Sequence, residues 1–216
     1  MQIVNRCIDP PWGVERKVQR SLQWINPPDL RGLDCIYLED EFPKAIDLTA
    51  NWAKRAQEES AQVYGWYSPS KADSPAYIML YIRQIYKGVP SFLSWSTIPT
   101  IRIVRTLAHE VAHHLAATRG YINQKDEIRD EELLANRYAD NVLQKMMRHW
   151  SYRFGQLCLK EIAGWHYAFG NVNWRQQQYK AAANHFFTAW DLDPENKNAS
   201  YWYWRAKEKC SIESKK

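Results

Sequence analysis

A clear pattern of apolar and polar positions lies between Pro99 and Gly120. No proline or glycine falls inside this span, and Thr100 and Gly120 are suitable helix-capping residues at its two ends. At about 100° per residue, five apolar residues share one side of the predicted helix: Ile101, Val104, Ala108, Val111 and Leu115. The pattern therefore predicts one uninterrupted helix with a core-facing stripe.

The first hundred residues hold nine of the ten prolines, so we expect short elements there and mostly helices afterwards. Apolar spacing and turn residues predict a helix over 14–25, a buried strand over 33–38, a helix over 43–59, and strands over 61–67 and 76–82. The chain is long enough for one sizeable α+β domain followed by a small helical appendage.

A second long helix is predicted after Gly120. One face of it carries Glu132, Ala135, Asn136, Ala139 and Leu143. The two alanines on this face would allow the helix to approach the first one closely. That closeness matters if a carboxylate of the second helix is to reach a metal ion about 2 Å away.

The first helix contains the sequence His109-Glu110-Val111-Ala112-His113. Two histidines four residues apart project from the same helix face, about 120 to 160° from the centre of the apolar stripe, and can bind one zinc ion. Glu110 is placed to take a proton from a water at that ion. The plain alternative is a polar helix face that carries its histidines by chance.

A third ligand would decide between these interpretations. A metzincin-type site is excluded, because Ala116 and Arg119 stand where that class has a glycine and a third histidine. A carboxylate from the second helix is the remaining source. Glu131 and Glu132 are adjacent there, and the acidic run from Asp126 to Glu132 also suits a solvated first helical turn.

The HExxH sequence and the later Glu132-Leu-Leu-Ala135-Asn136-Arg-Tyr-Ala139 together resemble the gluzincin metallopeptidases, in particular the minigluzincins and the ImmA/IrrE-type repressor-cleaving peptidases. The resemblance implies a zincin-like fold over residues 1–152 and a Zn²⁺ ion held by His109, His113 and Glu132. It implies Glu110 as general base and Asn136 as a partner that orients a ligand histidine.

The same resemblance implies hydrolysis of a peptide or protein substrate, held along the edge strand beside the site. Residues 76–82 are either that edge strand or a central core strand. The oxyanion donor is left open among Tyr138, His114, Tyr121 and His166.

The character of the chain changes after Trp150, and residues 153–216 are expected to form a helical segment. Six residues stand at the offsets typical of a tetratricopeptide repeat: Gly170, Tyr179, Ala182, Phe186, Ala189 and Pro194. Asn173 departs from the pattern, which has an aromatic residue there. A further helix is predicted over 199–209. Such a segment either docks a protein partner or caps the first domain.

Composition limits the location and the partners. The net charge of +5 comes without a long basic block, so nucleic-acid binding is not indicated. No run approaches eighteen apolar residues, and the four cysteines show no framework spacing, which favours a cytoplasmic protein with free thiols that does not enter a membrane.

The sequence is therefore compatible with three functions. These are a zinc metallopeptidase, a metal-binding regulator of the same fold with little turnover, and a helical adaptor whose HExxH sequence is accidental.

Overall fold

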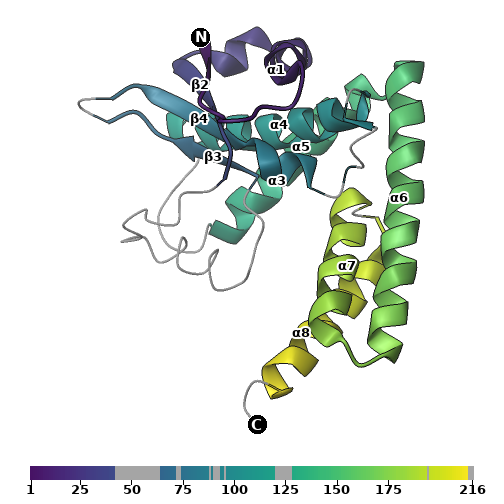
Figure 1. Cartoon of the computed structure of the whole chain (residues 1–216). Helices are drawn as coiled ribbons and strands as arrows, with labels where there is room; N and C mark the ends of the chain where they lie inside the picture. Colours follow the sequence, from purple (N-terminus) through teal and green to yellow (C-terminus); the bar gives the residue numbers. More distant parts are fainter. Residues whose placement is uncertain are drawn as a thin grey trace. The chain divides into compact units, whose positions relative to one another are not determined.

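The computed structural model describes residues 1–41, 64–71, 74–87, 89, 93–94, 96–119, 128–193 and 195–213 (Figure 1). The chain divides into two compact units, 1–152 and 153–216. The first unit is a mixed α+β structure, whereas the second is helical throughout its described part. The predicted helix over 43–59, Tyr121 and Gly120 lie outside the described residues.

The first unit is built on a four-stranded sheet with the order β1-β2-β4-β3. Strands β1 (Gln2–Asn5), β2 (Leu33–Glu39) and β4 (Ala76–Tyr81) are parallel, and β3 (Gly65–Ser68) runs antiparallel to β4. The strand predicted over 33–38 is confirmed, and β1 was not predicted.

Strand β4 is a central strand of the sheet, because it pairs with β2 on one side and with β3 on the other. The interpretation of residues 76–82 as the edge strand is therefore wrong. Among the described strands, β3 forms that edge. The observed strand β4 also ends at Tyr81, one residue before the predicted end, because Ile82 begins the short helix α3 (Ile82–Tyr86).

One face of the sheet forms the core of the first unit. Ile36 and Leu38 of β2 stand opposite Ile78 and Leu80 of β4, and all four side chains are fully buried. Alternation along a strand puts every second residue on the same face, so these four residues form one continuous apolar surface. Helix α4 packs on this sheet through contacts with β3 and β4.

Helix α4 (Ile98–Arg119) is the central helix of the first unit. Helices α1 (Val14–Leu22) and α5 (Ile128–Met146) and the 3₁₀ helix η1 (Pro27–Leu30) also contact it. The predicted cap at Thr100 is wrong, because α4 begins at Ile98 and the Oγ of Ser96 accepts the backbone N–H of Ile98 at 3.2 Å. Pro99 then lies in the first turn, where its missing N–H costs nothing.

The second unit contains helices α6 (Trp150–Arg175), α7 (Tyr179–Leu192) and α8 (Lys197–Glu213), of which α6 begins just before the boundary. Its core gathers small and aromatic residues: Ala182, Ala183, Phe186, Tyr203 and Ala206, with Tyr167, Trp174, Phe187, Trp190 and Trp202 packed around them. Gly170 is required by this packing, because a Cβ there would lie 2.6 Å from the ring of Phe186.

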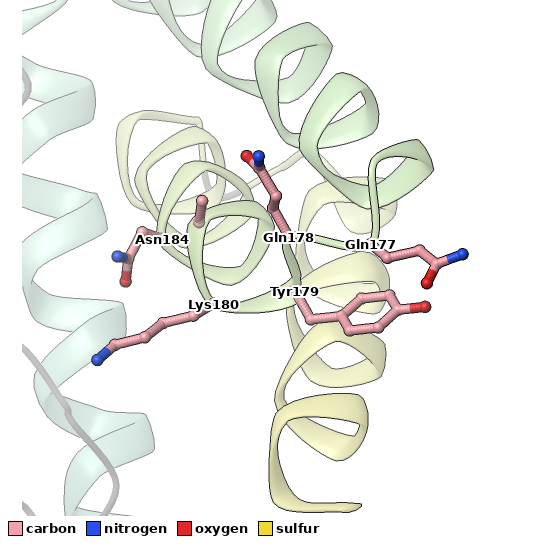
Figure 2. A pocket seen from close by; sticks show the side chains of 6 residues that line it. Gln177, Gln178, Tyr179, Lys180 and Asn184 are labelled. Atoms are coloured by element: carbon pink, nitrogen blue, oxygen red, sulfur yellow. The ribbon is translucent and has the colours of Figure 1, made fainter. Parts of the chain in front are cut away.

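An open hollow lies at the turn between α6 and α7, where Gln177 has a positive φ of 60°. Figure 2 shows that Lys180 and Asn184 point to one side of this hollow, while Gln177 and Tyr179 point to the other. Because the polar groups do not converge, the hollow offers no arrangement that could hold a ligand in one orientation.

Two further findings concern the cysteines and the helices. Cys7, Cys35, Cys158 and Cys210 form no disulfide bond, and Cys35 is buried. In the part of the chain that the structure describes, every helix is too short or too polar to cross a membrane.

Candidate metal centre

Helices α4 and α5 bring three metal-ligating side chains together at one point. His109 and His113 lie one turn apart on α4, and their Nε2 atoms are 3.1 Å from each other. Glu132 on α5 faces both rings, with Oε2 3.4 Å from Nε2 of His109 and Oε1 3.4 Å from Nε2 of His113. These three residues form the one group of histidine, cysteine or carboxylate side chains among the described residues whose donor atoms could hold a metal ion.

The spacing of these donors fits a tetrahedral metal. Two ligand atoms bound to zinc at about 2.0–2.1 Å, with the tetrahedral angle between them, lie about 3.4 Å apart. The observed separations of 3.1, 3.4 and 3.4 Å are close to that value. The Glu132 side chain is 53% exposed, whereas those of His109 and His113 are 22% and 17% exposed, so solvent reaches the group from the carboxylate side.

Glu131 contacts the other nitrogen of His113. Nδ1 of His113 donates to Oε1 of Glu131 at 2.8 Å, which fixes the ring with its Nε2 facing His109 and Glu132. The two adjacent carboxylates therefore differ in position. Glu132 is one of the three possible metal ligands, and Glu131 contacts the opposite side of the His113 ring. Asn136, predicted to orient a ligand histidine, is exposed, and its described contacts include no hydrogen bond to His109 or His113.

Charges at this group are strongly coupled. Burial lowers the pKa of His113, but the hydrogen bonds that its ring donates to Glu132 and Glu131 and the charge of Glu110 outweigh burial and raise the pKa to about 9. Hydrogen bonds from both histidines hold the pKa of Glu132 far below its usual range. In the absence of a metal, the carboxylates thus stabilise the protonated, positively charged form of His113. A bound divalent cation would take the place of that proton and its charge.

Glu110 is buried beside the donor group, with 8% of its surface exposed. Burial raises the pKa of its carboxyl, while the charges of His109 and His113 and a hydrogen bond from the backbone N–H of Tyr67 act in the opposite direction. Strand β3 passes so close that a Cβ on Gly65 would lie 2.9 Å from Cγ of Glu110 and 2.8 Å from Cγ2 of Thr106. The edge strand and the buried carboxylate are therefore in direct contact.

Two of the candidate oxyanion donors make hydrogen bonds elsewhere. His114 is 1% exposed; its Nε2 donates to the carbonyl of Arg31 at 2.8 Å, and its Nδ1 lies 3.2 Å from the hydroxyl of Tyr67. The hydroxyl of Tyr138 donates to Asp29 at 2.8 Å. Tyr121 lies outside the described residues, and His166 belongs to the second unit.

Sequence reasoning missed the parts played by Gly65, Tyr67 and Glu131. A signal for Gly65 was present, because a glycine inside a strand pattern often marks a close backbone approach. Tyr67 acts through its backbone, which carries no residue-type signal. Glu131 was considered only as a rival to Glu132, and its actual place depends on which ring nitrogen it meets.

Comparison with known proteins identifies no relative, since no protein-family model, curated protein or solved structure matches the chain. The geometry of the site therefore stands alone as the basis for a function.

Proposed function

We propose that the chain is a zinc-dependent metallopeptidase of the gluzincin type, which hydrolyses peptide bonds of a peptide or protein substrate. The observation that supports this most is the donor triangle of His109, His113 and Glu132, with separations of 3.1 to 3.4 Å, next to the buried carboxylate of Glu110. If the HExxH sequence were accidental, there would be no reason for a carboxylate of a separate helix to lie at the distance that separates two ligands of one metal ion.

The residues divide the chemistry between them. A zinc ion held by His109, His113 and Glu132 would supply Lewis acidity toward a carbonyl oxygen and a water. Glu110 would accept the proton of the attacking water and return it to the leaving amine. A carboxyl whose pKa is raised by burial suits both steps, since it holds a proton more readily than an exposed one.

The edge strand supports binding of an extended substrate. Strand β3 borders the site through the contact of Gly65 with Glu110, and a peptide that pairs with β3 would pass beside the donor group. This function, predicted for residues 76–82, thus falls to β3 in the proposal.

The proposal for residues 153–216 is a tetratricopeptide-like segment that docks a protein partner. It is supported by the pairing of α7 with α8 and by the packing of Gly170 on α6 against the Phe186 ring on α7, two residues that stand at expected offsets. Cysteines that form no disulfide favour a reducing compartment, so we propose a cytoplasmic protein.

The substitution Glu110→Gln tests the enzyme. The purified full-length chain is loaded with zinc and incubated with a peptide library, and new termini are counted by mass spectrometry. We expect Glu110→Gln to keep one zinc per chain at the donor group and to lose cleavage by about 10²-fold or more. Glu208→Gln, on the exposed face of α8, is the matched control and should cleave like the wild type.

The second candidate is a metal-binding regulator of the same fold with little turnover. It is favoured by the hydrogen bonds of His114 and Tyr138, which keep two candidate oxyanion donors occupied elsewhere. Zinc binding without cleavage in the wild type, together with cellular activity that survives Glu110→Gln, would support the regulator and contradict the peptidase.

A further inference from the structure

A second pair of histidines lies in the helical unit, on elements other than α4 and α5. His166 is on α6 and His185 is on α7, and their Nδ1 atoms are 3.1 Å apart. The ring centroids are 5.3 Å apart with an interplanar angle of 37°. Both side chains are half-buried, so the pair is held by packing and is still reached by solvent. The proposed function leaves these two residues without a part.

Two facing Nδ1 atoms have two chemical explanations. In a hydrogen bond between neutral rings, one histidine must carry its proton on Nδ1 and the other must accept with a bare Nδ1. In a metal site, both rings carry the proton on Nε2 and both Nδ1 lone pairs point at one cation. Burial lowers the pKa of each ring, and for His166 the neighbouring His185 lowers it further, so both rings favour the neutral form that metals bind.

The separation suits two neighbouring positions in a coordination sphere. With bonds of about 2.0 Å, donors 3.1 Å apart subtend about 100° at the metal. That angle lies between the 90° of a tetragonal copper(II) or nickel(II) site and the tetrahedral angle of zinc. It is far from the straight geometry of two-coordinate copper(I).

The surroundings leave the two imidazoles as the protein's ligands. One helical turn away from His166 are Ile162 and Gly170, and one turn away from His185 are Ala181 and Ala189. The Phe169 ring lies 5.7 Å from the ring of His185. Among the described residues, no third histidine, cysteine or carboxylate joins His166 and His185 in a group that could hold a metal ion. Water would therefore complete the coordination of the ion.

We propose that His166 and His185 form a second metal site, which binds a divalent transition-metal cation through the two Nδ1 atoms and prefers copper(II) to zinc. The preference follows from the general order of affinities for divalent metals, in which copper(II) binds most tightly, since two imidazoles and water add no ligand that selects zinc. Two neutral ligands make the site weaker than the donor group on α4 and α5, and its ion exchangeable.

The test counts metal ions on the full-length chain. Equilibrium dialysis against copper(II), followed by elemental analysis, should give two ions per chain for the wild type and one for His166→Asn. Asparagine can still make a hydrogen bond near the Nδ1 position, so this variant separates metal binding from packing. His149→Asn is the matched control and should keep two ions, since His149 packs on Trp24 in the other unit.

Failure of this site and failure of the first one are distinguishable. The double variant His109→Ala/His113→Ala should lose one copper and keep the other, and its electron paramagnetic resonance spectrum should show two coupled nitrogens that vanish on adding His185→Asn. A wild type that binds at most one copper, which the double variant loses, would overturn the second site. So would a His166→Asn chain that keeps two ions, or a spectrum of the double variant without nitrogen coupling.

Discussion

Glu131 accepts a hydrogen bond from Nδ1 of His113 at 2.8 Å, on the side of the ring opposite the proposed metal position. Such a carboxylate fixes the tautomer and makes the ligating nitrogen more basic. We therefore expect Glu131→Ala to weaken zinc binding by about 10- to 100-fold while one ion per chain still binds at saturation. Competition with a chromogenic chelator measures this change.

The adjacent residue provides the comparison. Glu132→Ala removes a donor, so it should abolish stoichiometric zinc binding at concentrations where Glu131→Ala remains loaded. If the two variants exchange these behaviours, Glu131 is the ligand and the assignment of Glu132 is wrong.

Gly65→Ala should impair cleavage without removing zinc. Its Cβ would lie 2.9 Å from Cγ of Glu110 and 2.8 Å from Thr106, so β3 or the Glu110 side chain must shift. A displacement of that size at a proton-transferring group reduces kcat by about 10- to 100-fold. Zinc content by elemental analysis should be unchanged, and a drop in kcat with normal zinc is the expected signature. Full activity in this variant would show that Glu110 needs no fixed position.

Zinc binding should depend on pH through His113. In the metal-free chain its pKa is raised to about 9, so below that pH a zinc ion must displace a proton. Affinity should rise by about tenfold per pH unit up to about pH 9 and then level off. Calorimetry in buffers of different ionisation enthalpy should detect one released proton near neutral pH, and the absence of any release would contradict the prediction.

The stability of the metal-free chain should follow the same groups. The raised pKa of His113 gives a stabilisation that is complete below its ordinary value of 6.5 and is lost as the pH rises through about 9. The lowered pKa of Glu132 gives a second stabilisation, which is present above pH 4.5 and is lost as the pH falls below that value. Urea unfolding of the metal-free chain should therefore show highest stability between about pH 5 and about pH 7.

Two glycines of α6 should respond in opposite directions to alanine. At Gly164 a Cβ meets nothing within 4 Å, so Gly164→Ala should stabilise the helical unit by about 0.5–1 kcal/mol. At Gly170 a Cβ would lie 2.6 Å from the Phe186 ring, and Gly170→Ala should destabilise by about 1–3 kcal/mol. Thermal unfolding followed by circular dichroism measures both, and equal effects would contradict the packing described.

The local parts of the site could be predicted from the sequence. His109 and His113 share a helix face because the spacing of four residues fixes it, and the face of α5 that carries Glu132 follows from the same rule. The rotation of α5 against α4 is not local, and it decides whether Glu131 or Glu132 meets Nε2 of the histidines. The start of α4 was misplaced because the helix begins at Ile98, whose backbone N–H is accepted by Ser96, so Thr100 already lies inside the first turn.

Sheet order could not be predicted for a related reason. The apolar run of β4 suits a central strand as well as an edge strand, and one of its two neighbours, β2, comes from residues far away in the chain. The short β1 has too few residues for a periodic signal.

The contact of Tyr67 with Glu110 has a consequence for association between chains. Because the carbonyl of Tyr64 accepts the N–H of Tyr81, alternation turns the backbone groups of Gly65 and Tyr67 away from β4, toward the open side of the sheet. An exposed row of such groups is a template for uncontrolled strand addition. Glu110 occupies the N–H of Tyr67, so any strand that pairs with β3, whether a substrate peptide or a second chain, finds this backbone group already taken by the carboxylate proposed for proton transfer.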